Sequence, residues 1–168
     1  PYRVDFVKFG EYGVSQMFDV MFLYSGNLNV SSSIKEVTEN LILKKVEPLL
    51  DKYELKYHNY VSSKHKNNAI YFNLGSVSPR SSATSYALSN TISLLMEVRG
   101  VGLNRDSFNR RVFTTYLLGY SFLNTSVNHA NEIQLALEEA NNFNDEIIIK
   151  YKKEKSGYTL NMIDVYEN

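Results

Sequence analysis

The stretch Ser93-Leu94-Leu95-Met96-Glu97-Val98-Arg99-Gly100-Val101-Gly102 decides how the rest of the chain is interpreted. Its hydrophobic run indicates a strand buried on both faces, and the Gly-x-Gly that follows ends it. Glu97 stands at the end of this run, where an unpartnered ionised carboxylate would lose far more hydration than it regains. Two interpretations stay open: Arg99 neutralises Glu97 as a structural pair, or Glu97 faces a cleft at the strand end and acts as a catalytic base.

The composition excludes several classes of protein. The chain has 168 residues, enough for one domain with a proper core. Lysine plus arginine and aspartate plus glutamate number 18 each, and this zero net charge argues against a dedicated nucleic-acid binder. The absence of cysteine excludes disulfides, thiolate nucleophiles and cysteine-type zinc sites. No apolar run approaches the roughly 18 residues that span a bilayer.

The hydrophobic pattern alternates between helical and strand-like periods. It predicts a helix over 34–52 that is capped by a serine among 31–33, and Pro48 kinks this helix or starts a second helical piece. It also predicts a short helix or turn over 83–89. A long helix capped by Asp106 or Ser107 follows, and the pattern reaches residue 140 either as its continuation or as a second helix. It predicts strands over 18–24, 55–61, 69–74 and 91–98, with the polar stretch 62–68 as a solvated loop. Past Asn142, two β-rich segments flank Lys155-Ser156-Gly157 and predict a hairpin over 146–165. The fold class predicted is therefore α/β, a mixed sheet flanked by helices with a C-terminal β-hairpin.

Familiar catalytic motifs are missing from the sequence. No H-E-x-x-H or H-x-H motif includes His58, His65 or His129, so surface or packing roles are expected for them. No G-x-S-x-G or dinucleotide-binding loop occurs. Arg110 and Arg111 fall in the last helix, where they are expected to form a solvated face or to pair with nearby carboxylates. Taken alone, the residues indicate an α/β domain with a carboxylate at a strand end.

The run 90–102, followed by Ser107-Phe108-Asn109-Arg110-Arg111-Val112, resembles the zinc carboxypeptidase (peptidase M14) family. Bacterial members carry a similar N-x-I-S-L-L-x-E-x-R-G-x-G and F-x-R-R-V signature near the end of the catalytic domain. The resemblance covers roughly residues 2–126. It implies that residues 1–126 are the C-terminal portion of a carboxypeptidase-like three-layer α/β/α domain, and that residues 127–168 form a helix and β-hairpin extension.

The resemblance also implies an activity. By analogy, Glu97 is the general base toward a zinc-bound water, and Arg80 and Tyr86 lie where the family builds its substrate side-chain pocket. The implied cofactor is zinc, and the implied substrate is a peptide or a peptidoglycan-derived peptide cleaved at its C-terminus. The habits of the family suggest a periplasmic or secreted protein.

The sequence departs from the family pattern at the metal site. Upstream of the run 90–102, where the family places them, the sequence has neither the H-x-x-E ligand pair nor the Asn-Arg pair that grips the substrate carboxylate, and no histidine follows Val4-Asp5 directly. We therefore expect the sequence to be part of a longer zinc carboxypeptidase and inactive alone, with no metal ligand identifiable in it. The alternative is a non-catalytic carboxypeptidase-like domain that has lost its zinc site. A third interpretation is an unrelated α/β module in which Glu97 and Arg99 form a buried pair.

Overall fold

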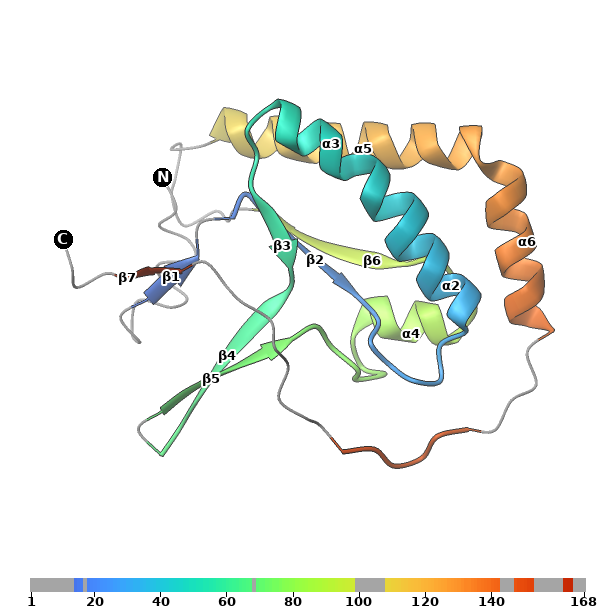
Figure 1. The fold of residues 1–168 in the computed structure, drawn as a ribbon, viewed down its shortest axis with the longest axis horizontal. Coiled ribbons are helices and arrows are strands. Elements are labelled where there is room, and N and C mark those ends of the chain that lie inside the picture. Colours follow the sequence, from blue (N-terminus) through green and yellow to red (C-terminus); the bar gives the residue numbers. More distant parts are fainter. Residues whose placement is uncertain are drawn as a thin grey trace.

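The computed structural model describes residues 14–16, 18–67, 69–98, 108–142, 147–152 and 162–164. Within these residues the central sheet has the strand order β3 (Tyr57–Asn59), β2 (Val20–Tyr24), β6 (Leu94–Val98). Strand β3 is parallel to β2, and β6 is antiparallel to it, so the sheet is mixed. Helices lie around this sheet (Figure 1). The predicted α/β fold class with a mixed, helix-flanked sheet is confirmed.

Most of the predicted helices are present, with different bounds. They are α2 (Ser32–Glu36), the π-helical segment η2 (Val37–Leu43), α3 (Lys44–Lys52), α4 (Ser82–Leu88), α5 (Phe108–Asn128) and α6 (Ala130–Asn141). The first predicted helix is thus one run whose geometry widens just before Pro48, a common device for accommodating a distortion. The expected side-chain cap does not form, because the Ser31 hydroxyl pairs instead with that of Ser33 at 2.9 Å. No helix in the described part of the chain is long and apolar enough to cross a membrane.

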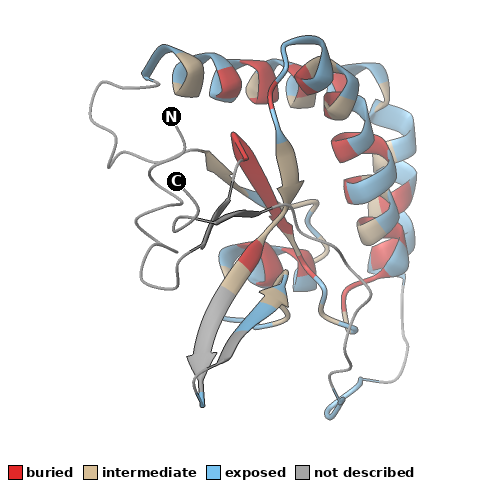
Figure 2. Ribbon diagram, turned by 60° about the vertical axis from the view of Figure 1, so that its left-hand side comes forward, coloured by how far each residue is buried: buried red, intermediate tan, exposed pale blue. Residues whose placement is uncertain are grey.

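The main core lies on one face of the central sheet. Side chains alternate along a strand, so Val20 and Phe22 of β2 point to the same side. There they meet buried residues of η2, α3 and α5, and the cluster comprises Val20, Phe22, Leu43, Val46, Leu50, Leu55, Leu117 and Leu118. Met96 and Val98 of β6 pack against the same cluster. On the opposite face, Met21 packs with Phe18 and Val61. In Figure 2, strand β2 is buried along almost its whole length, while the helices carry both buried and exposed positions.

Residues 62–68, predicted as a loop, belong largely to a β-hairpin instead. Strands β4 (Val61–Lys66) and β5 (Ala69–Leu74) pair antiparallel in a continuous register. Asn67 at the tip has a φ of 53°, a left-handed conformation that asparagine tolerates better than most residues. The prediction was wrong because backbone hydrogen bonding and turn chemistry, rather than an apolar pattern, form this strand.

The C-terminal hairpin predicted over 146–165 is also wrong as a pairing. Residues 147–152 form no strand, and β7 (Met162–Asp164) pairs antiparallel with β1 (Val14–Gln16). A specific contact explains why residues 147–152 form no strand. The Asn29 side chain accepts a hydrogen bond from the Ile148 amide at 2.8 Å and donates to the Ile148 carbonyl at 3.0 Å. Asn29 therefore uses both backbone groups with which Ile148 would have joined a ladder.

The core predicts a large difference between two leucine-to-alanine substitutions. Leu118 is fully buried in the main cluster, so Leu118→Ala should lower the free energy of unfolding by about 2–5 kcal/mol. Leu135, on α6, is 65% exposed, so Leu135→Ala should change it by less than about 0.5 kcal/mol. Urea unfolding followed by circular dichroism measures both. Equal effects of the two substitutions would contradict this packing.

Candidate functional site

Glu97 lies on β6 and points away from the main core. Its neighbours Met96 and Val98 pack on the core face, so alternation directs the Glu97 side chain to the opposite face. It is half-buried there, and the residue opposite it on β2 is Met21. Arg99, the partner considered for a structural pair, lies outside the described residues. The geometry is that of a carboxylate at the end of a strand, on the less filled side of the sheet.

His58 shares this face and this level of the sheet with Glu97. Met21 pairs with Glu97 on one side and with His58 of β3 on the other, so the three residues form a row across the strands. The His58 ring stacks on Phe18 with 4.9 Å between the ring centroids. Its Nδ1 lies 2.8 Å from the carbonyl oxygen of Asn59. These contacts fix the ring, which is the packing role expected for it.

Arg80 and Tyr86 lie on a separate segment, close to one another in the sequence. Arg80 is exposed in the turn before α4, where its amide donates to the Ser78 hydroxyl at 3.3 Å. Tyr86 lies on α4, whose buried side is formed by Ala83, Thr84 and Ala87, and its ring is exposed. Helix α4 adjoins the start of β6, since the Ser93 hydroxyl donates to the Ala83 carbonyl at 2.6 Å. Both predicted substrate-pocket residues are therefore accessible.

The described residues do not by themselves fit a zinc ion. A zinc site needs at least three protein ligands drawn from histidine, cysteine and carboxylate side chains. No group of three or more such side chains gathers within the described ranges. Glu97 and His58 are separated by one strand, and adjacent strands lie about 4.8 Å apart, so their backbones are about 10 Å apart. Because Glu97 is the expected base rather than a ligand, this row offers His58 as a single candidate ligand, fewer than the three that a zinc site needs.

A cavity of about 720 Å³ opens elsewhere, between α6 and the segment that precedes β6. Its lining mixes apolar side chains such as Ile133 and Leu137 with the polar groups of Asn90 and Gln134. None of Glu97, Arg80 and Tyr86 lines it. This cavity is therefore separate from the residues that the sequence singled out.

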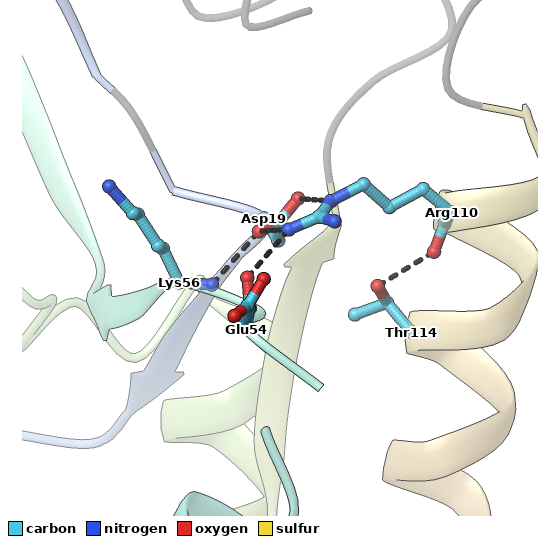
Figure 3. A network of polar contacts seen from close by, with 5 residues as sticks. All are labelled: Asp19, Glu54, Lys56, Arg110 and Thr114. Carbon is cyan, nitrogen blue, oxygen red and sulfur yellow. Dashed lines mark hydrogen bonds and ion pairs between the residues drawn. The ribbon is translucent and has the colours of Figure 1, made fainter. Parts of the chain in front are cut away.

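Among the described residues, the most deeply buried carboxylate is Asp19, which is 1% exposed, and an arginine on α5 neutralises it. Arg110 donates from Nε to one Asp19 oxygen at 2.7 Å and from a terminal nitrogen to the other at 2.8 Å (Figure 3). The Lys56 amide donates a third hydrogen bond to Asp19 at 2.9 Å. Such a two-pronged pair is among the stronger charged contacts in proteins. It confirms that Arg110 pairs with a carboxylate.

The turn after α3 completes this network. Leu55 donates its amide to the Leu50 carbonyl at 2.9 Å and Glu54 donates to Asp51 at 3.0 Å, the two hydrogen bonds of a Schellman helix end. Glu54 takes the left-handed position, with a φ of 53° where glycine is usual. Its carbonyl accepts a further hydrogen bond from Arg110 at 2.8 Å. The strained residue thus aims a backbone acceptor at the same guanidinium.

The sequence contains a signal for this network in the position of Asp19. Asp19 is the second residue of the apolar run 18–24, so the cost of burying a carboxylate applies to it even more strongly than to Glu97. The required partner, Arg110, belongs to the F-x-R-R-V segment, 91 positions away. The pair was therefore not predictable from local sequence patterns.

Comparison with known proteins finds similarity to fungal carboxypeptidases. The chain is 22% identical over 152 residues to "Probable carboxypeptidase 2" of Trichophyton verrucosum (strain HKI 0517), a match that covers 88% of this chain and 29% of the relative. Identity and coverage are the same for "Probable carboxypeptidase 2" of Arthroderma benhamiae (strain ATCC MYA-4681 / CBS 112371). "Carboxypeptidase 2" of Trichophyton rubrum is 21% identical over 151 residues, covering 87% of this chain and 28% of the relative.

The chain therefore spans less than a third of the length of the curated relatives it matches. No protein-family model matches it, and no solved structure matches it significantly. The similarity supports a carboxypeptidase-like chain at most.

The Asp19–Arg110 pair predicts a strong, specific loss of stability. Arg110→Ala should lower the free energy of unfolding by about 3 kcal/mol, the low end for breaking a buried pair, because Arg110 itself is partly exposed. Arg80→Ala, the matched change at an exposed arginine, should cost less than about 0.5 kcal/mol. Combining Arg110→Met with Asp19→Asn should cost less than the sum of the two single changes. Additive costs in urea unfolding would show that the two side chains do not interact.

Proposed function

We propose that this chain is the part of a metallocarboxypeptidase that carries the catalytic base, and that the complete protein hydrolyses peptide bonds at a C-terminus. The observation that carries the proposal is the position of Glu97, half-buried at the end of β6 and directed away from the packed core. The similarity to fungal carboxypeptidases over 88% of the chain supports it. The zinc-carboxypeptidase assignment rests on the motif around Glu97.

In this proposal Glu97 acts on a proton. A carboxylate within hydrogen-bond reach of the attacking water accepts its proton and later delivers a proton to the leaving amine. A base at a strand end suits this task because β2 and the core hold its backbone rigidly while its side chain faces outward. Arg80 and Tyr86 are the candidates for contacting the substrate, as an exposed cation and an exposed aromatic ring on the segment preceding β6.

Zinc forms part of the proposal as the cofactor implied by the motif. Because the described residues do not supply three ligands, the remaining ligands must come from outside them. Free peptides, protein tails and peptidoglycan-derived peptides are the proposed substrate class. The relatives are more than three times as long as the matched region, so the complete site is proposed for a longer polypeptide.

A non-catalytic carboxypeptidase-like domain is the second candidate. It is favoured by the missing ligand group among the described residues. Intact-mass analysis combined with zinc quantification on the purified natural protein separates the two. About one zinc per chain supports the enzyme, whereas a mature polypeptide with no H-x-x-E upstream of the Glu97 strand and without bound zinc supports the binding domain.

The catalytic proposal predicts the effect of one conservative substitution. Glu97→Gln keeps the size of the side chain but removes the base, so kcat on a C-terminal peptide substrate should fall about 10²- to 10⁴-fold in the complete, zinc-loaded protein. Glu139→Gln, the same change at an exposed position of α6, should leave kcat unchanged. Bound zinc should be equal in both variants. A Glu97→Gln protein with wild-type, zinc-dependent activity would refute the role of Glu97.

A further inference from the structure

Helix α5 carries more apolar side chains on its outward face than a helix at the surface of a monomer normally does. Such a helix normally directs its apolar stripe at the core. Three of the five buried residues of α5 are polar: Thr114, Ser121 and Thr125. The outward face instead carries six apolar side chains, each more than half exposed: Phe108, Val112, Tyr116, Tyr120, Leu123 and Val127. We call these six residues the outer stripe.

The outer stripe is long, continuous and uncharged. Its members recur at intervals of three or four residues over five turns, so they lie on one side of the helix. No aspartate, glutamate, lysine or arginine occurs between Arg111 and Glu132. Helix α5 runs along the border of the molecule beside α3 (Figure 1). The exposed rings of Tyr116 and Tyr120 stack on each other, with their centroids 6.3 Å apart. A surface of this kind favours burial against another apolar surface.

The area of the outer stripe fits one half of a stable interface. An aromatic side chain has about 150–250 Å² of surface, so these six exposed side chains present on the order of 600 Å². The largest apolar patch on an ordinary monomer is about 300–600 Å². A standard interface buries roughly 800 Å² on each partner, which the stripe approaches once its flanking residues are included.

The sequence of the stripe is complementary to itself when reversed. We consider a second α5 that lies antiparallel along the stripe, with the two-fold axis at the level midway between Leu117 and Leu118 along the helix. In this register Phe108 lies opposite Val127, and Val112 lies opposite Leu123. The same register places Tyr116 opposite Gly119, a large side chain against the smallest residue. An antiparallel pair also separates the two copies of Arg110 and Arg111, which a parallel pair would crowd together at one end.

Gly119 supplies an independent observation. A glycine inside a helix is less stable than alanine, so its presence needs a reason. Apart from its chain neighbours and the nearby backbone of its own helix, a Cβ added at Gly119 would meet no atom of the described residues within 4 Å. The packing of this chain therefore does not require the glycine, whereas close approach of a second helix would.

From these observations we propose that the chain forms a symmetric homodimer through the outer stripe, with the two α5 helices antiparallel about Leu117–Leu118. The proposal is independent of the peptidase function, because it rests on α5 alone. The second copy buries the apolar face that this chain leaves exposed, and each Tyr116 packs over the Gly119 backbone of the other copy.

Sedimentation equilibrium on the 168-residue chain tests the dimer. Leu123→Asp should weaken dimerisation at least about a hundredfold, because two carboxylates enter an apolar interface. Leu135→Asp, the same change at a residue of similar exposure on α6, should leave the dimerisation constant unchanged. Gly119→Ala should weaken the dimer while raising the thermal stability of the monomer, since alanine is the better helix former. A chain that stays monomeric up to millimolar concentration overturns the proposal, as does equal weakening by both aspartates.

Disulfide trapping tests the register without background, since the chain has no cysteine of its own. A mixture of Val112→Cys and Leu123→Cys proteins should form a covalent heterodimer under mild oxidation. Val112→Cys alone should not, because the two copies of residue 112 would lie about 16 Å apart along the helix axes, beyond disulfide reach. Efficient self-linking of Val112→Cys would point to a parallel pair and refute the arrangement. A dimer that resists cross-linking in the mixture would refute the register.

Discussion

The burial of one carboxylate constrains how the elements of this protein fit together. Asp19 lies at the entrance to β2 with almost no contact with water, so its charge must be met within the fold. Arg110 of α5 meets it with two hydrogen bonds, and Lys56, just before β3, adds a third. Asp19 and Val20 in turn donate their amides to the Lys56 carbonyl. One side chain thereby joins two strands of the sheet to the longest helix.

The contact of Asp19 with Arg110 and Lys56, which we call the junction, also determines which face of the sheet is packed and which face carries Glu97. With α5 held by Arg110 at its first turn, Leu117 and Leu118 reach the core face of β2 and complete the main cluster. Apolar side chains from β6 fill the same side, so Glu97 is left to the other. A rigid strand with one packed face and one outward carboxylate is a suitable support for acid–base chemistry. The proposed function therefore depends on a contact made by residues remote from Glu97 in the sequence.

The sequence was sufficient to predict the elements whose signals are local. Strand β5 and helix α4 coincide with the patterns that predicted them, and the mixed α/β class follows from their alternation. Elements that depend on distant partners were not predictable. Strand β4 has a polar sequence and exists through its ladder with β5, while Asn29 holds Ile148 away from a hairpin across 119 positions. For the site, the motif located Glu97 in the sequence. The carboxylate that is deeply buried and needs a charged partner is Asp19, and this pair was not predicted because Arg110 lies 91 positions away.

Amide hydrogen exchange at Lys56 tests the central role of the junction most directly. This amide precedes β3 and donates to a side chain rather than to a strand, so only the Asp19–Arg110 pair justifies strong protection. The account predicts that the Lys56 amide exchanges with the same opening free energy as the Val20 amide, through global unfolding. Exchange of Lys56 at the rate of an exposed turn, with Val20 still protected, would contradict it.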